Sequence, residues 1–485
     1  MYHRLAIFFL AVSANQKKEY RSMGKCRCIA AALCVTLAVL GVTGHQPAVA
    51  ATGEDFLAGA AKKEIVPPFP TKMGGFSART EEFTGVDFPI YARALVFQHG
   101  DTELVIIATD LVGVSWNLVE GARESIEEAT GIPGDHILIS ATHSHSGPSG
   151  WQDMSHYGED FDEDLYNFLV ERFTEATVEA RDGLRPAVLA HGAGHLDEIT
   201  NNRQGNNDVI DPEVGVLKVQ EPETREVIAT LINFTGHPVI LGSDNTLVSG
   251  EYPGYASKVV EEALGGVALF TQGACGEITM NRSGDPYKEV RRLGRAVAGE
   301  VLRTAETAEP EEISLLMSRF ERIQVEPRDI PSVEEAERQL EEAEARVEEA
   351  REAGEPEAYI ESLEEKANKA GNTVYVAMLQ EHFDGEFLAA AADSSVHVMQ
   401  VGPVVLVGIP GELFVEYGLE MKQRVRANKD RPMMLVGFAN DYTGYLVTPR
   451  AWHTGGYEAG ISRVAPESAR MLTERAMTLV DKYAE

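Results

Sequence analysis

Cysteine is scarce in this sequence and almost absent beyond its N-terminal segment. Three of the four cysteines, Cys26, Cys28 and Cys34, lie near the N-terminus, and only Cys275 lies in the remaining chain. A single cysteine cannot form an internal disulfide, so a chain that loses its N-terminal segment depends on its hydrophobic core for stability. With 485 residues, of which 44% are hydrophobic, the chain is long enough to bury a large core.

Long apolar runs are scarce too, and the N-terminal run has the features of a secretory signal. From Met23 a short basic stretch leads into apolar residues 29–42 and then into small residues before Ala51. This order predicts a signal peptide, so we expect residues 1–50 to be removed, Met23 to be the true start, and the product to be secreted or periplasmic. No other run approaches the roughly 20 apolar residues of a membrane-spanning helix, so residues 51–485 are expected to form a soluble domain.

Basic residues are under-represented, with 43 Lys and Arg against 76 Asp and Glu and a formal net charge of −33. This balance argues against nucleic acid or an anionic membrane surface as the main partner. In residues 332–371 a capping box from Ser332 to Glu335 opens two highly charged helices, broken at residues 354–356. Only a thin apolar stripe runs along them, so we expect a solvated helical hairpin inserted in the domain and not part of a site, with a cover over the cleft or a partner-binding element as the alternatives.

Segments of strand length alternate with helical patterns along the rest of the chain. Continuous apolar runs predict strands at residues 104–109, 137–139, 227–234, 267–270, 396–401, 404–409 and 434–438. Amphipathic patterns between them predict helices, as in residues 118–129. Strand-helix-strand units of this kind favour parallel crossovers, so the sequence predicts an α/β fold with a mixed, largely parallel sheet flanked by helices.

Polar side chains that suit metal chemistry follow several of these strands. They are Asp110, His143, His145, His237, Glu412 and Tyr445. An extended backbone at residues 143–145 would turn both imidazoles the same way, which suits two metal ligands or one ligand beside an acid/base group. Each of these features also has a structural alternative. The histidines would be loop residues with their hydrogen bonds satisfied, and Glu412 would stabilise a helix N-terminus. The glycine-rich residues 272–277 would form a tight turn in place of an oxyanion site. Two imidazoles, a carboxylate and an open position make a usual catalytic zinc set, which favours a zinc hydrolase.

Several motifs of the chain occur together in one known family. They are Met73-Gly74-Gly75-Phe76, the SATHSHSGP string at residues 140–148, Gly236-His237-Pro238, Pro410-Gly411-Glu412, and Asn440-Asp441-Tyr442 followed by Tyr445 and Tyr457. The histidine string and the step between the last two tyrosines are the most specific of them. On these motifs, residues from about 56 to 484 resemble the catalytic domain of the neutral (alkaline, non-lysosomal) ceramidases.

The resemblance implies the chemistry of the site. It implies that one zinc ion per chain is bound by His143, His237, Glu412 and Tyr445. It also implies that His145, Arg203 and Tyr457 line the reacting amide, as acid/base group and oxyanion stabilisers, in a direct hydrolysis without an acyl-enzyme. Thr279 stands where the family has a serine important for activity, so a hydroxyl is kept and a methyl group is added. We also expect the family's C-terminal immunoglobulin-like domain to be absent.

Two classes of function follow from these residues. The first is a secreted zinc amidase that cleaves the N-acyl bond of ceramide or a related N-acyl lipid, with a zinc hydrolase of a non-lipid amide or ester as a close variant. The second is a binding protein that retains the fold while its histidines are structural. We expect the partner to be a lipid or another N-acyl small molecule. Peripheral contact with membrane lipid is compatible with this expectation, and nucleic acid is not an expected partner. The oligomeric state is left open.

Overall fold

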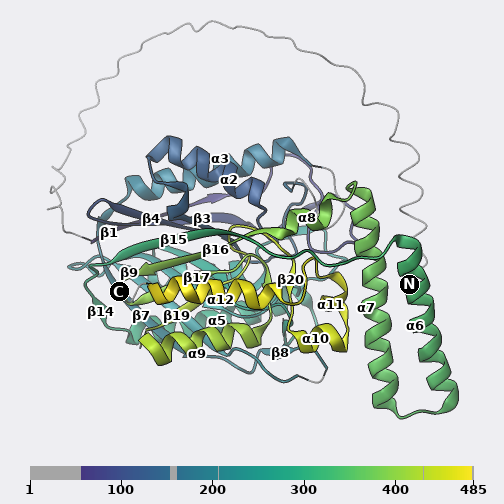
Figure 1. Ribbon diagram of the computed structural model, residues 1–485. Coiled ribbons are helices and arrows are strands. Elements are labelled where there is room, and N and C mark those ends of the chain that lie inside the picture. Colours follow the sequence, from purple (N-terminus) through teal and green to yellow (C-terminus); the bar gives the residue numbers. More distant parts are fainter. Residues whose placement is uncertain (1–55, 153–160, 206, 430, 483–485) are drawn as a thin grey trace, which may run out of the picture. The chain divides into compact units, whose positions relative to one another are not determined.

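A computed structural model describes residues 56–152, 161–205, 207–429 and 431–482 of the chain (Figure 1). The predicted signal segment, residues 1–50, lies outside the described residues. The chain divides into two compact parts, Met1–Thr52 and Gly53–Glu485. Everything described below belongs to the part from Gly53 to Glu485. None of the helices in the described ranges combines the length and the apolar character that crossing a bilayer requires.

Three sheets of the described chain follow one plan. Three antiparallel strands are followed by a helix, a fourth strand parallel to the third, and a second helix. In the first unit of this plan the elements are β1 (Phe56–Glu64), β3 (Tyr91–His99), β4 (Thr102–Thr109), α2 (Trp116–Thr130), β5 (Ile137–Ala141) and α3 (Glu163–Asp182). The edge strand β6 (Arg185–Pro186) pairs with β1.

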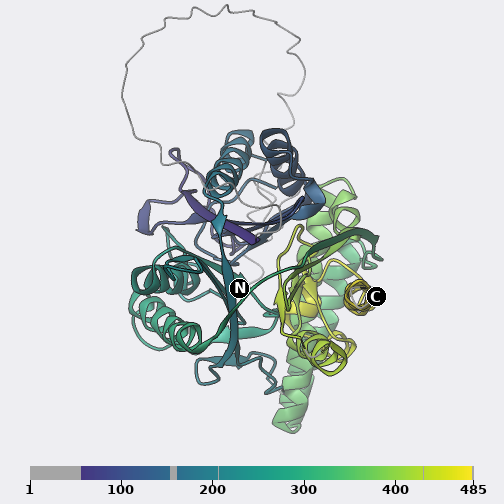
Figure 2. The same ribbon diagram turned by 90° about the vertical axis from the view of Figure 1, so that its left-hand side faces the viewer.

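The second and third units repeat this order. The second contains β7 (Val188–His195), β9 (Glu213–Gln220), β10 (Val227–Phe234), α4 (Glu251–Leu264), β12 (Val267–Gln272), α5 (Pro286–Thr307) and the edge strand β14 (Pro310–Glu311). The third contains β15 (Leu316–Gln324), β16 (Asp393–Val401), β17 (Val404–Gly408), α9 (Val415–Lys429), β19 (Met433–Val436) and α12 (Ser468–Asp481). Figure 2 shows the three units as separate groups, purple to blue, teal, and green to yellow, each with its helices on the outside.

Further elements lie outside this common plan. The insertion between β15 and β16 contains α6 (Val333–Ala353), α7 (Glu357–His382) and α8 (Glu386–Ala392), and α6 and α7 form the long pair on the right of Figure 1. The remaining elements are β2 (Gly85–Phe88), β8 (Thr200–Asn202), β11 (Leu247–Ser249), β13 (Ile278–Met280), β18 (Glu412–Leu413), β20 (Tyr445–Leu446), α10 (Pro449–Thr454), α11 (Tyr457–Ile461) and a 3₁₀ turn (Gly134–His136).

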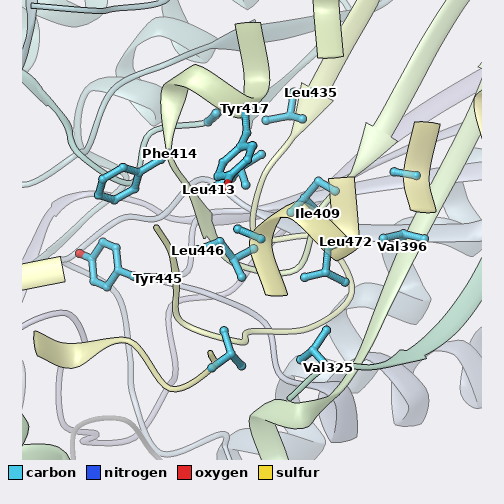
Figure 3. Close-up of a cluster of buried hydrophobic side chains, with 14 of the residues drawn as sticks. Val325, Val396, Ile409, Leu413, Phe414, Tyr417, Leu435, Tyr445, Leu446 and Leu472 are labelled. Carbon is cyan, nitrogen blue, oxygen red and sulfur yellow. The ribbon is translucent and has the colours of Figure 1, made fainter. Parts of the chain in front are cut away.

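The core lies between the sheets and beneath their helices. One buried cluster joins all three sheets, for example through Phe97 of β3, Leu231 of β10 and Leu406 of β17. A second cluster, part of which is drawn in Figure 3, fills the third unit beneath α9 and α12 and has Tyr445 at its edge, with the hydroxyl pointing away from the labelled aliphatic side chains. Burial of each large aliphatic or aromatic side chain contributes about 1.5–3 kcal/mol, so these clusters stabilise the fold without disulfides.

The predicted α/β class is confirmed, and the sheet arrangement differs from the expectation in one respect. Instead of one largely parallel sheet, the described chain has several sheets, and each of the three large ones contains a single parallel pair. The reason is that every residue of β10 and β17 is buried, because helices cover one face and other sheets the opposite face. Antiparallel strands buried on both faces show the continuous apolar runs that are typical of parallel sheets.

Candidate metal centre and its cavity

The ends of the parallel strand pairs bring together side chains from all three units. His143 follows β5, His237 follows β10, and Glu412 lies in β18 just after β17. The Nε2 atom of His237 is 2.9 Å from Oε2 of Glu412, and Nε2 of His143 is 3.5 Å from the same oxygen. Nε2 of His145 lies 3.0 Å from Nε2 of His143. All four side chains are buried, and they meet at one point of the fold.

The backbone at His143 is not extended, contrary to the sequence-based expectation. Its φ is +66°, in the left-handed region that residues with a side chain rarely adopt. This bend places the imidazoles of His143 and His145 edge to face, with ring centroids 4.5 Å apart, and the ring of Phe438 stacks on His143 at 4.1 Å. Such a backbone costs roughly 1–3 kcal/mol and persists where the surrounding packing fixes it, often at functional sites.

The hydrogen bonds of two imidazoles fix where their protons lie. Nδ1 of His143 is 2.5 Å from the carbonyl oxygen of Val112, and Nδ1 of His237 is 2.6 Å from that of Cys275. A carbonyl oxygen only accepts, so each Nδ1 carries a proton, and in the neutral form of each ring Nε2 is the atom with the lone pair. Burial, reinforced by the charge of Arg203, lowers the pKa of His237 to about 4, so this imidazole is neutral at pH 7.

In the neutral imidazole of His237, Nε2 therefore directs a lone pair at Glu412, and Nε2 of His143 faces the same carboxyl oxygen. Acceptors that face one another at about 3 Å repel unless a cation lies between them. The ring nitrogens of His143, His145 and His237 lie within 4.8 Å of one another, so this cluster can bind a metal ion. The donor set and its orientation fit a metal, because backbone acceptors on Nδ1 are what metal-binding imidazoles usually have.

Tyr442 supports the carboxylate of this cluster and was not predicted as a site residue. Its hydroxyl donates to Oε1 of Glu412 at 2.5 Å, which leaves Oε2 facing the two imidazoles. Its place in the Asn440-Asp441-Tyr442 motif was the available signal, but sequence spacing alone does not say which way a tyrosine points.

A second group of polar side chains lies around Arg203. The guanidinium donates from Nε to Oε1 of Glu458 at 2.6 Å and from Nη2 to the hydroxyl of Tyr445 at 3.1 Å. Tyr445 pairs with Glu412 through the parallel ladder between β18 and β20, and its ring lies 5.8 Å from that of Tyr457, at the start of α11. The structure thus connects the predicted Arg203, Tyr445 and Tyr457 and adds Glu458, which no motif indicated.

The two groups share one cavity of about 1170 Å³. His145, His237, Arg203, Tyr445 and Tyr457 line it, while His143 and Glu412 are buried behind this lining. Residues of α7, among them the range 358–368, form another part of its wall. The expectation of a solvated hairpin outside the site therefore does not hold for α7, because a row of charged residues on a helix faces a polar cavity as readily as it faces solvent.

Comparison with known proteins places this geometry in a family. Residues 56–291 match the family described as neutral/alkaline non-lysosomal ceramidase, N-terminal. The neutral ceramidase of Pseudomonas aeruginosa is 24% identical over an alignment that covers 81% of this chain and 67% of that protein. The crystal structure of neutral ceramidase from Pseudomonas aeruginosa superposes with a TM-score of 0.70 and 21% identity, over 88% of this chain and 75% of that chain. A ceramidase complexed with C2 gives a TM-score of 0.70 and 20% identity, over 88% and 76%.

Residues 56–291 of the chain belong to the neutral/alkaline non-lysosomal ceramidase family.

Thr279, at the position where the resemblance implies a serine, lies beside the histidine cluster and outside the described lining of the cavity. Thr279 pairs with Asn201 in the ladder between β13 and β8, and its backbone bridges to His237. Among the described residues that line the cavity, Thr279 is absent. In this ceramidase family member the threonine thus contacts the loop of His237, and its backbone contributes to the position of that imidazole.

Asp110 and the glycine-rich turn have structural roles in this member of the family. Asp110 forms a buried ion pair with Arg93 at 2.7 Å and accepts from the backbone of Tyr91 at 2.9 Å, and it does not belong to the described lining of the cavity. In the turn, the N–H groups of Gly273 and Gly276 donate to carbonyl oxygens of Phe234 and Leu413. These donors are engaged within the fold, so the turn is a structural one that orients His237 through the Cys275 carbonyl.

Gly75 packs against the side chain of His145. Its φ is +102°, and a Cβ built on it would lie 2.6 Å from Cβ, Cγ and Nδ1 of His145. The guanidinium of Arg79 donates to the backbone oxygen of His145 at 2.7 Å. The first motif of the family resemblance therefore positions the second histidine of the central string.

Proposed function

We propose that this protein is a hydrolase that cleaves the N-acyl bond of ceramide or a related N-acyl lipid, releasing a free fatty acid and an amine. The observation that carries the proposal is the meeting of His143, His237 and Glu412 within 3.5 Å of one another's nitrogen and oxygen atoms, beside a cavity that His237 and Arg203 line. Family membership supports the reaction class, since the relatives that the chain matches are neutral ceramidases.

We further propose that the ion is one zinc per chain, held by His143, His237, Glu412 and Tyr445. Two imidazoles and a carboxylate are usual zinc ligands, and Tyr445 adjoins Glu412 in the β18–β20 ladder. When bound, zinc polarises a carbonyl oxygen and lowers the pKa of water toward about 7.

His145 fits an acid/base role better than a ligand role. Unlike Nδ1 of the other two histidines, its Nδ1 has no hydrogen-bond partner in the described part of the structure, so no carbonyl fixes its tautomer. Burial, with the neighbouring His143 and His237, lowers the pKa of His145 well below its usual value. His145 is therefore neutral at pH 7 and able to accept a proton from the attacking water and pass it to the amine nitrogen.

Arg203 and Tyr457 are placed to stabilise the oxyanion that develops on the amide carbonyl. Arg203 is fixed by Glu458, Tyr445 and the Gly276 carbonyl before substrate arrives, so little reorganisation is required during the reaction. We assign direct attack of water on the amide, without an acyl-enzyme, and the position of Thr279 outside the described lining of the cavity agrees with this assignment.

Export is part of the proposal and depends on residues 1–50 alone. Expression of the full sequence in a bacterial host, followed by N-terminal sequencing of exported protein, is expected to give a first residue near Ala51. Retention of the intact N-terminus on cytoplasmic protein would contradict export.

Metal content and turnover measured together test the catalytic proposal. Purified protein is expected to contain near-stoichiometric zinc by elemental analysis and to release fatty acid from N-acylsphingosine. His237→Ala and Glu412→Gln should lose zinc and activity, whereas His145→Ala should keep zinc and lose activity. His191→Ala, on β7 with its imidazole beside Glu311, is the matched control. A chain that holds no zinc and stays inert with zinc added would instead be a binding protein.

A further inference from the structure

The short helix α11 carries two residues of the site at its start. Tyr457 lines the cavity, and the buried carboxylate of Glu458 accepts from Nε of Arg203 at 2.6 Å. Oε2 of the same carboxylate accepts from Nε2 of Gln204, also at 2.6 Å. A movement of α11 would therefore displace Tyr457 directly and Arg203 through its ion pair.

The backbone of α11 packs closely on α7 of the inserted hairpin (Figure 1). A Cβ built on Gly460 would lie 2.6 Å from Cβ of Asn372 and 2.8 Å from the backbone oxygen of Lys369. Just before α11, the N–H of Gly456 donates to the backbone oxygen of Glu365 at 2.8 Å. Backbone and Cβ atoms cannot rotate away as the end of a long side chain can. Contacts with α7 therefore fix this segment at both of its ends.

Arg328, in the loop between β15 and α6, connects α11 to α7. Its side chain is buried, and Nη1 donates to the backbone oxygens of Gly460 at 2.6 Å and Ser462 at 3.2 Å. Nη2 donates to Oγ1 of Thr373, on α7, at 2.6 Å. The planar fork of an arginine directs its donors at fixed angles, so these bonds hold their acceptors in a defined geometry. One guanidinium thus joins the end of α11 to α7.

This arginine has no carboxylate partner in the described part of the chain. Its hydrogen-bond acceptors are neutral, and burial lowers the pKa of Arg328 to about 10. Lys369 of α7 lies near it, since both cations contact the ring of Trp452, and Nζ of Lys369 donates to the Trp452 oxygen at 2.7 Å. Burial of a cation beside neutral acceptors opposes folding, so stability alone does not explain this arrangement.

We infer that Arg328 is a positioning residue for the proposed hydrolysis, and that it fixes α11 together with α7 so that Tyr457 and the Glu458–Arg203 pair meet the reacting amide. This inference rests on the proposed function. It gives the inserted hairpin a role in the rate of the reaction, beyond its place in the cavity wall. The histidines of the metal cluster follow β5 and β10, outside these contacts, so zinc is expected to stay bound when the contacts are broken.

Gly460→Ala tests the contact between α11 and α7 in the zinc-loaded enzyme. The added Cβ requires a displacement of about 1 Å, because ordinary carbon contacts begin near 3.5 Å. We expect kcat for N-acylsphingosine to fall about tenfold to 100-fold, with zinc content and KM near those of the wild type. Gly299→Ala is the matched control, since it also lies in a helix and no described atom beyond the neighbouring backbone lies within 4 Å of its added Cβ.

Arg328→Met should lower kcat in the same way without adding bulk. Arg123→Met is its control, because Arg123 is similarly buried and donates to the backbone oxygen of Ile137 at 2.8 Å, away from α11. Double-mutant cycles separate positioning from a general loss of stability. Arg328→Met is combined with Tyr457→Phe and, separately, with Glu458→Gln. In at least one of these backgrounds it should cost less activity than in the wild type.

Hydrogen exchange gives a measurement that does not depend on turnover. Amides of residues 457–462 should exchange about tenfold faster in Arg328→Met than in the wild type or in Arg123→Met. Unchanged exchange in this segment, or effects on activity that multiply independently in both cycles, would overturn the inference. Failure of the zinc-loaded wild type to cleave N-acylsphingosine would refute the proposed function, and the exchange comparison would still decide whether Arg328 holds α11 in place.

Discussion

Replacement of Gly75 by alanine is expected to impair the proposed acid/base step while leaving the metal ligands in place. The new Cβ would lie 2.6 Å from three atoms of His145. Ordinary carbon contacts begin near 3.5 Å, so the imidazole must retreat by about 1 Å. The backbone of His145 is held by Arg79, and the displacement therefore falls mainly on the ring. A shift of about 1 Å in a catalytic group costs on the order of 100-fold in rate.

Steady-state hydrolysis of N-acylsphingosine and zinc content, measured on the same preparations, separate the two effects. We expect kcat/KM to fall about 100-fold in Gly75→Ala, with zinc content unchanged, because the three atoms nearest to the added Cβ all belong to His145. Gly131→Ala is the matched control, since its φ is +81° and nothing lies within 4 Å of the added Cβ. It carries the same backbone strain without the collision. Wild-type activity in Gly75→Ala would refute the role given to His145.

Three further perturbations follow from the buried contacts. Tyr442→Phe removes the hydrogen bond to Glu412 and should weaken zinc affinity about 10- to 100-fold, measured by competition with a chelator. Asp110→Ala leaves Arg93 buried without its partner and should cost about 3–5 kcal/mol in chemical denaturation, less if Arg93→Met is added. Because His237 has its pKa lowered to about 4 in the fold, the unfolded chain binds more protons between pH 4 and about 6.5, so stability rises with pH there. Denaturation of metal-free protein should show up to about 3 kcal/mol lost as pH falls through this window, and a flat profile would contradict the buried neutral imidazole.

The strands, and the positions of His143 and His237 just after two of them, were predictable from local pattern, whereas the arrangement of the strands was only partly so. Apolar runs placed β4, β5, β10 and β17 within a few residues, since burial on both faces removes polar positions from a strand. The same burial concealed strand direction, because antiparallel strands between two packed layers lack the usual alternation. The parallel pairs were predicted correctly where a helix connects them, as in β4-α2-β5.

Other features depended on three-dimensional contacts that the sequence does not carry. The left-handed backbone of His143 is set by packing against Phe438, which is far away in the chain. Glu412 was expected at a helix start and lies instead in β18, where pairing with β20 decides its direction. Charged helices have the same sequence pattern whether they face solvent or a polar cavity, so the sequence did not predict that α7 lines the cavity.

The common plan of the three units has a thermodynamic consequence. His143, His237 and Glu412 each come from a different unit, so the proposed cation would link all three units. At a thousandfold excess over its dissociation constant, such an ion adds about 4 kcal/mol to the folded state. Chelation should therefore loosen the whole assembly at once, with hydrogen exchange accelerating in β5, β10 and β17 together.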